Sequence, residues 1–149
     1  MKPTRPRDLV IIALVAMLAG FGLFAWVYGE LPPLPYNFAA STLVLAVAEL
    51  LWAPSVKARL AGRPRTKPIL PIAVARTAAC AKASSVLAAL GAGGWLGALV
   101  YLLLKLDLKA ARADAVVAGV NVLACAVLLA AALRMEAVCR RKDPPPAPA

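Results

Sequence analysis

Histidine is absent from this sequence of 149 residues, and acidic residues are scarce, with 7 aspartates and glutamates in all. Without histidine the chain has no Ser-His-Asp or Cys-His arrangement to activate a nucleophile. It also contains no glycine-rich loop of the kind that cradles phosphate, and no carboxylate pair suited to acid–base catalysis. We therefore predict no catalytic residue, no cofactor-binding residue and no metal ligand, and we do not expect this chain to be an enzyme.

Cysteine is also rare, with three residues in the chain. Cys80 and Cys139 are expected on the cytoplasmic side of a membrane, and Cys125 lies inside an apolar segment. No two of them have the spacing of metal ligands, and a disulfide is not expected in a reducing compartment.

Charged residues make up only 16% of the chain, whereas 62% is hydrophobic and the mean hydropathy is +0.79. Such a chain has too little polar surface to cover itself in water. Apolar runs without charge occupy residues 9–28, 31–48, 83–104 and 115–133. Each is close to the ~20 residues with which an α-helix crosses about 30 Å of hydrocarbon, and the alternating pattern of barrel strands is missing. We therefore predict an all-α membrane protein, a bundle of four transmembrane helices.

The expected domain order is a basic N-terminal segment (1–8), a four-helix transmembrane domain (9–139) and a disordered proline-rich tail (140–149). The helices are expected over about 9–28, 36–53, 71–104 and 115–139, with Asp8 and Asp114 as N-caps. The short proline-rich link 29–35 favours a tight antiparallel hairpin of the first two helices, and Pro54 should end the second. The first run is longer than the apolar core of a signal peptide and has no small-x-small cleavage site, so we expect it to remain as a helix.

The third helix is expected to be much longer than a membrane requires. Pro71 suits the first turn of a helix, and neither proline nor another stop signal follows before residue 104. A helix over 71–104 would measure about 51 Å, against about 30 Å of hydrocarbon. Its basic beginning should therefore extend into the cytoplasm, and only residues from 83 onward should be immersed.

The basic residues are distributed unevenly between the two ends of the predicted helices. Fourteen cations flank the start of the first helix, the link between the second and third, and the end of the fourth: Lys2, Arg5, Arg7, Lys57, Arg59, Arg63, Arg65, Lys67, Arg76, Lys82, Arg134, Arg140, Arg141 and Lys142. Three lie at the other end: Lys105, Lys109 and Arg112. The positive-inside rule places both termini in the cytoplasm. It explains the net charge of +10 without nucleic acid, and it predicts contact with anionic lipid headgroups.

A ladder of small residues on the third helix is the sharpest packing signal in the sequence. Ser85, Ala89, Gly93 and Gly97 follow one another at intervals of four residues. Lipid is as apolar as leucine, so helices associate tightly in a membrane where small residues let their backbones approach closely. This face could dock a second copy of the chain or another membrane protein. Alternatively it could pack on the first or fourth helix of the same chain, and residues 16 and 20 offer a matching face on the first.

Two polar residues within the apolar segments are candidate functional groups. Glu49 is the only acid inside an apolar run, about one turn from the cytoplasmic boundary. We predict that it forms an ion pair with Lys82 or Arg76 and so fixes the second helix against the third, the alternative being a carboxylate that couples to protons or a substrate. Asn121, about two turns into the fourth helix, is expected to form interhelical hydrogen bonds.

Several segments taken in order resemble a family of small actinobacterial membrane proteins, domain of unknown function 3180. They are MKPTRPRDL at the start, LPPLP after the first helix, LAVAEL around Glu49, PIAVARTAACAKASS entering the third helix and ARADAVVAGV opening the fourth. The resemblance implies a plasma-membrane protein of four helices in a bacterium. It supplies no activity, ligand or catalytic residue.

Three functional hypotheses follow. The first is a non-catalytic membrane protein that acts by association, as an accessory subunit or a homo-oligomer, with the third helix as its docking face. The second is a small transporter or channel subunit that uses Glu49 and Lys82, with Arg76 and Asn121, near the inner leaflet. Coupling sites usually lie near the midplane between repeats, which disfavours transport by this chain alone. The third is a membrane anchor for a cytoplasmic enzyme.

Overall fold

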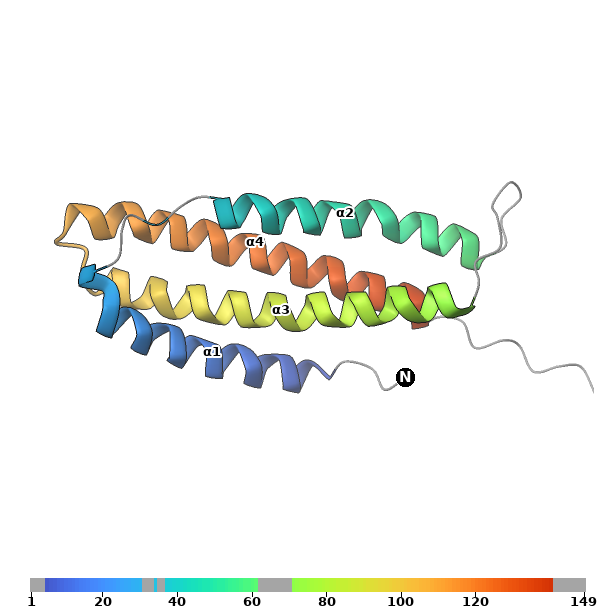
Figure 1. Ribbon diagram of the computed structural model, residues 1–149, viewed down its shortest axis with the longest axis horizontal. Coiled ribbons are helices and arrows are strands. Elements are labelled where there is room, and N and C mark those ends of the chain that lie inside the picture. The colour runs from blue at the N-terminus through green and yellow to red at the C-terminus, as the bar shows by residue number, and fades with distance from the viewer. Residues whose placement is uncertain (1–4, 31–33, 35–36, 62–70, 141–149) are drawn as a thin grey trace, which may run out of the picture.

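The structure is a computed structural model that describes residues 5–30, 34, 37–61 and 71–140. It contains four long helices, α1 (Pro6–Val27), α2 (Asn37–Leu60), α3 (Pro71–Leu103) and α4 (Lys109–Arg140), and a short 3-10 helix, η1 (Tyr28–Glu30), after α1 (Figure 1). All four long helices are long and apolar enough to cross a membrane. The predictions of an all-helical chain and of four membrane spans are therefore confirmed at the level of helix length and composition.

Helix ends that differ from the predictions include the start of α1, where Asp8 was expected as the N-cap, and the end of α2, which was expected at Pro54. α1 begins with Pro6 in its first turn and Arg5 as the N-cap, so Asp8 lies in the first turn, where a negative charge is favourable. α2 does not stop at Pro54 but continues to Leu60. In a membrane protein, neighbouring helices and local adjustments compensate for the hydrogen bond that proline removes. Val56, beyond the proline, is buried against α3 and α4, and this packing holds the extra turns in place.

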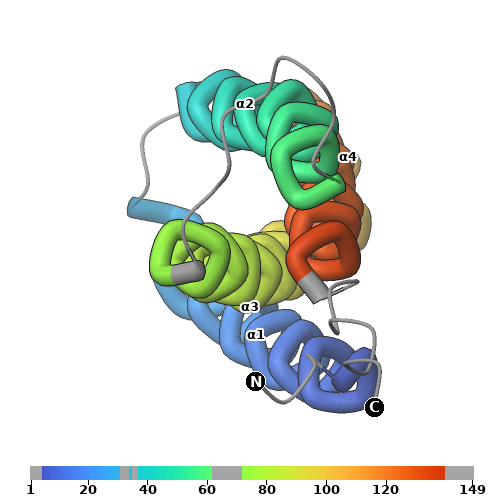
Figure 2. Tube along the Cα trace, turned by 90° about the vertical axis from the view of Figure 1, so that its right-hand side faces the viewer, coloured from blue at the N-terminus to red at the C-terminus, as the bar shows by residue number. Residues whose placement is uncertain are grey.

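The helices pack as a row in the order α1, α3, α4, α2. Figure 2 shows α1 and α2 on opposite sides of the pair formed by α3 and α4. The predicted hairpin of the first two helices is wrong, because α1 packs along α3 and α2 packs along α4. The chain reverses direction from each long helix to the next, so both of these pairs are parallel (Figure 1). The short link after α1 fixes the direction of α2, but small residues on the helix faces decide its neighbour.

Small residues also dominate the interior between α2, α3 and α4. At the middle of the row, Ala46, Ala88 and Leu128 form one buried cluster, with one residue from each helix. A second cluster lies towards the end of α2, and a third joins the end of α3 to the start of α4. The many alanines at these contacts let the backbones approach closely, which is the main source of packing energy between helices in lipid.

One end of the molecule carries most of the described cations, and we call it the basic end. It contains the first residues of α1 and α3 and the last residues of α2 and α4 (Figure 1). Its described basic residues are Arg5, Arg7, Lys57, Arg59, Arg76, Lys82 and Arg134. Lys105, Lys109 and Arg112 lie at the opposite end. The remaining cations named in the sequence analysis, and the predicted disordered tail, lie outside the residues or side chains that are described.

Candidate functional site

The C-terminal half of the predicted small-residue ladder, Gly93 and Gly97, packs against α1 of the same chain. A Cβ atom on Gly93 would collide with the carbonyl oxygen of Ala13 and would lie 2.9 Å from the Cβ of Ala16. A Cβ atom on Gly97 would collide with the carbonyl oxygen of Met17 and would lie 2.6 Å from the backbone nitrogen of Phe21. These distances leave no room for any side chain at either glycine. The ladder therefore serves contact within the chain, which is one of the two uses that the sequence left open.

The match with α1 is reciprocal. A Cβ atom on Gly20 would collide with the carbonyl oxygen of Gly94 and would lie 3.0 Å from its Cα atom. The N-terminal half of the ladder is also enclosed, since Ser85 is 0% and Ala89 is 2% exposed. No member of the ladder is therefore open to a partner, so the ladder itself is not the docking face of the first hypothesis.

A second face of α3 contacts α4. A Cβ atom on Gly91 would lie 2.9 Å from the Sγ atom of Cys125, which is buried. Gly91 and Gly93 are two residues apart, so they point to different sides of the helix at about 100° per residue. α3 therefore lies between α1 and α4 because glycine occurs on both sides of it. Gly91 was not among the predicted packing residues, although Gly93 and Gly94 lie close to it in the sequence.

Asp114 links three parts of the chain at the end opposite the basic end. Its carboxylate accepts a hydrogen bond of 2.9 Å from the hydroxyl of Tyr28 and one of 3.2 Å from the backbone N–H of Leu34. Asp114 is only 8% exposed. Because α4 begins at Lys109, Asp114 is not the predicted N-cap but lies inside the helix. It fixes the end of α1 and the following link to α4, a role that the sequence analysis missed.

Glu49 lies on the side of α2 that faces α3 and α4. Ala46, about one turn earlier, and Val56, about two turns later, both pack against these two helices. Residues three apart on a helix share a face, so Glu49 follows Ala46 towards the same interior. Its Oε2 atom is buried and has no hydrogen-bond partner in the described part of the chain.

The structure does not bring Glu49 together with the predicted cations. Within the described residues, neither Lys82 nor Arg76 forms an ion pair with it. Ala81 is the residue of α3 that faces α2 and α4 at this end, and Lys82 is rotated from it by about 100° and is exposed. The predicted ion pair therefore fails on geometry, because its cation is on a different face of α3.

Substituting Glu49 tests whether its carboxylate has a structural partner. Glu49→Gln should raise the free energy of unfolding in micelles by about 1–2 kcal/mol, because an acidic side chain without a partner is more costly in a membrane span than an amide. Chemical denaturation followed by circular dichroism would measure the change. Asp107→Gln, at an exposed position between α3 and α4, is the control and should have no effect. A loss of stability in Glu49→Gln alone would show that the carboxylate is paired.

Asn121 is fully buried on α4 but bonds within its own helix. Its Nδ2 atom donates a hydrogen bond of 2.8 Å to the carbonyl oxygen of Val117. Its Oδ1 atom is buried without a partner in the described part of the chain. Ser85 likewise donates to a carbonyl of its own helix, at 2.8 Å from Lys82. Within the part of the chain that the structure describes, Asn121 therefore does not form the predicted interhelical hydrogen bonds, because a backbone carbonyl on its own helix is nearer.

The three cysteines are free thiols. Cys80 is exposed, Cys125 is buried and Cys139 is half-buried. Among the described residues, no group of three or more cysteine, aspartate or glutamate side chains has the geometry to hold a metal ion.

A family model described as a protein of unknown function, DUF3180, matches residues 9–143. The chain belongs to the DUF3180 family. The match covers α2, α3 and α4 completely and all but the first three residues of α1. No curated protein and no solved structure matches the chain. The DUF3180 assignment agrees with the resemblance found in the sequence, and it assigns no ligand or reaction to Glu49, Asn121 or the glycines of α3.

Proposed function

We propose that this DUF3180 protein is a non-catalytic integral membrane protein of the bacterial plasma membrane. In this proposal both termini are cytoplasmic, and the protein acts by association, as an accessory subunit or a homo-oligomer. The uneven distribution of cations supports the orientation, because seven described cations gather at the basic end and three at the opposite end. The basic beginning of α3 then extends into the cytoplasm.

The observation that carries the proposal is the open row of helices. α1 packs along only one long helix, and the most apolar stretch of α1 contains no buried residue. A stripe along its outer side carries Val15, Leu18, Gly22 and Trp26, and we call it the outer face of α1. Leu18 is 69% and Trp26 is 88% exposed, and a Cβ atom on Gly22 would meet no atom within 4 Å. Since the glycines of α3 are used within the chain, we place the association on this face.

Measurement of copy number in native membrane tests the proposal. The tagged full-length protein would be extracted directly into polymer discs and its copies counted by single-molecule photobleaching. We expect two or more copies in each disc, or one copy with another membrane protein at a fixed ratio. A single copy accompanied only by lipid would contradict association.

A matched pair of substitutions tests the location of the contact. Gly22→Leu should reduce the assembled fraction by about tenfold, because it separates two backbones in contact. Gly119→Leu on α4 is the control, since a Cβ atom there also meets nothing within 4 Å. If assembly is unaffected by Gly22→Leu, the contact lies on another face.

One observation favours a transporter or channel subunit as a second candidate. Ionisable groups inside membrane spans often mark ion or substrate pathways, and the Oε2 atom of Glu49 is buried without a hydrogen-bond partner among the described residues. Loss of solute or proton flux in Glu49→Gln proteoliposomes, at unchanged protein abundance, would support this role. Equal flux in wild type, Glu49→Gln and empty liposomes would contradict it.

A further inference from the structure

A cavity of about 600 Å³ lies between α2 and α4 at the basic end. This volume is within the range of pockets that bind small ligands, roughly 300–1,000 Å³. Seven of the nine lining residues are uncharged and apolar, two are cations and none is acidic: Leu50, Ala53, Pro54, Lys57, Leu60, Ala61, Arg134, Ala137 and Val138. The cavity is therefore amphipathic, and its charge is positive.

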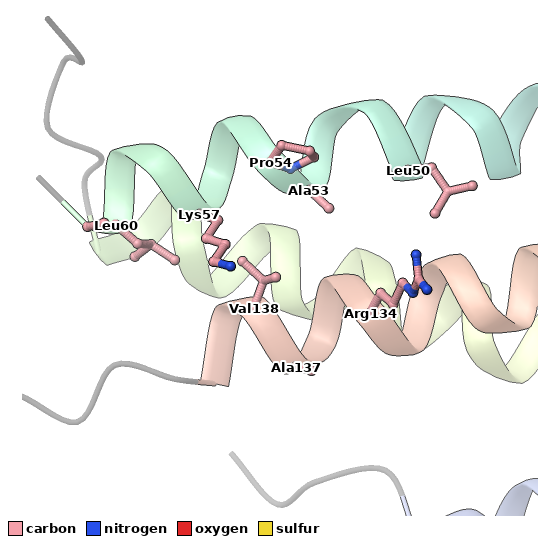
Figure 3. A pocket seen from close by; sticks show the side chains of 9 residues that line it. Leu50, Ala53, Pro54, Lys57, Leu60, Arg134, Ala137 and Val138 are labelled. Carbon is pink, nitrogen blue, oxygen red and sulfur yellow. The ribbon is translucent and has the colours of Figure 1, made fainter. Parts of the chain in front are cut away.

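The two cations come from facing helices. Figure 3 shows the side chain of Lys57 extending from α2 towards α4 and that of Arg134 extending from α4 towards α2. Within the described residues, neither of these side chains has a hydrogen bond or an ion pair. The lining residues include these two cations and no acid, so an anion between the two walls would be attracted to both.

The depth of the cavity corresponds to a membrane interface. Trp52 is 63% exposed on α2, and tryptophan is enriched where hydrocarbon meets headgroups. Leu50 lines the cavity on the apolar side of this level and Ala53 lies close to it, while Lys57 lies about one turn beyond Pro54 towards the end of the helix. Along the α2 wall of the cavity the apolar residues Leu50, Ala53 and Pro54 are therefore followed by the cation Lys57, in the same order as the chains and phosphate of a lipid.

We propose that this cavity binds an anionic phospholipid from the leaflet at the basic end. The phosphate lies between Lys57 and Arg134, and the beginning of the acyl chains lies along Leu50 and Ala53. Basic pockets between membrane helices on the cytoplasmic side are suited to such headgroups. The assignment of this leaflet as the cytoplasmic one rests on the orientation in the proposed function. Binding of the lipid itself depends on neither the orientation nor the association of the protein.

Lipid binding to the purified full-length protein tests the inference. The protein would be stripped of lipid in detergent, and phosphatidylglycerol or phosphatidylcholine of equal chain length would be titrated while native mass spectrometry counts the bound molecules. We expect one phosphatidylglycerol to bind more tightly than the rest, and we expect no such site for phosphatidylcholine. The double substitution Lys57→Gln with Arg134→Gln should lower the affinity of this site for phosphatidylglycerol by about thirtyfold, because it removes both cations that face the phosphate.

Three controls separate the cavity from the basic surface around it. Arg59→Gln with Arg76→Gln removes the same charge from positions that do not line the cavity, and it should leave the tight site unchanged. Lys57→Arg with Arg134→Lys keeps both charges and should retain binding. Ala137→Leu keeps both charges but fills the cavity, so it should weaken the site even though the basic surface is intact.

Several results would overturn the inference. Equal losses in the two pairs of glutamine variants, or full binding by Ala137→Leu, would mean that phosphatidylglycerol is held only by the general positive charge. Equal binding of the two lipids would exclude an anionic site. Displacement of the tight phosphatidylglycerol by soluble glycerol phosphate would show that a free phosphate, not a lipid, is the ligand. None of these results depends on the copy number that tests association.

Discussion

Gly97→Ala should lower the free energy of unfolding in micelles by about 3 kcal/mol, at the upper end of the usual cost of overpacking. The added Cβ atom would collide with the carbonyl oxygen of Met17 and would lie 2.6 Å from the backbone nitrogen of Phe21. Backbone atoms cannot rotate away as a flexible side chain does, so α1 has to move away from α3. Gly93→Ala should have a similar effect for the same reason.

Gly94→Ala is the matched control for these substitutions. It lies on the same helix between the two sensitive positions, yet a Cβ atom there would meet nothing within 4 Å. Alanine at this position should leave stability unchanged or raise it slightly, because alanine favours a helix more than glycine does. Equal stability of the Gly94→Ala and Gly97→Ala proteins would contradict the packing of α1 on α3.

Asp114→Ala should destabilise the opposite end of the molecule by about 3 kcal/mol. It removes the acceptor of two hydrogen bonds, and hydrogen bonds to a charged group contribute roughly 1.5–3 kcal/mol each when measured by substitution. Tyr28→Phe removes only one of the two and should cost about half as much. Hydrogen exchange provides a more specific measurement, because the amide of Leu34 should lose protection in Asp114→Ala and keep it in Tyr28→Phe.

A double-mutant cycle and a control residue complete this test. The substitutions at Tyr28 and Asp114 should be coupled by about 1.5 kcal/mol, since they remove the same hydrogen bond. Asp107→Ala, at an exposed position, should have no effect on stability or on the amide of Leu34. Additive effects of Tyr28→Phe and Asp114→Ala would show that the hydrogen bond between them does not stabilise the protein.

The sequence was sufficient to predict the four helices because the length of an apolar run is set by the thickness of a membrane. It also indicated part of the packing, since residues 16 and 20 were identified as a possible partner for the small-residue ladder, and residue 16 lies opposite Gly93. Small residues are informative in this setting because they alone allow close backbone contact in lipid.

The order of the helices in the row was not predictable in the same way. In lipid, both the exposed and the buried faces of a helix are apolar, so hydrophobicity does not show which neighbour a face contacts. The expected hairpin relied on the short link after α1, which does not force α2 to pack against α1. The end of α2 at Pro54 and the start of α4 at Asp114 were predicted wrongly for a related reason. The preferences of proline and aspartate for helix ends come from helices in water, whereas here tertiary contacts hold both residues inside their helices.

The cavity at the basic end was not visible in the sequence, because Lys57 and Arg134 are far apart in the chain. In the sequence, each of these two residues is indistinguishable from the other cations near the helix ends. Only the packing of α2 along α4 brings them to one space, and that packing was not expected.

Cysteine accessibility in intact cells tests directly whether four helices span the membrane with the basic end in the cytoplasm. The native residues Cys80, Cys125 and Cys139 would be replaced by alanine, and a single cysteine would be introduced at Asp107 or at Arg59. A maleimide that does not cross membranes should label Asp107→Cys in intact cells and Arg59→Cys only after the membrane is permeabilised. Labelling of both positions from the same side, or the reverse order, would contradict the account.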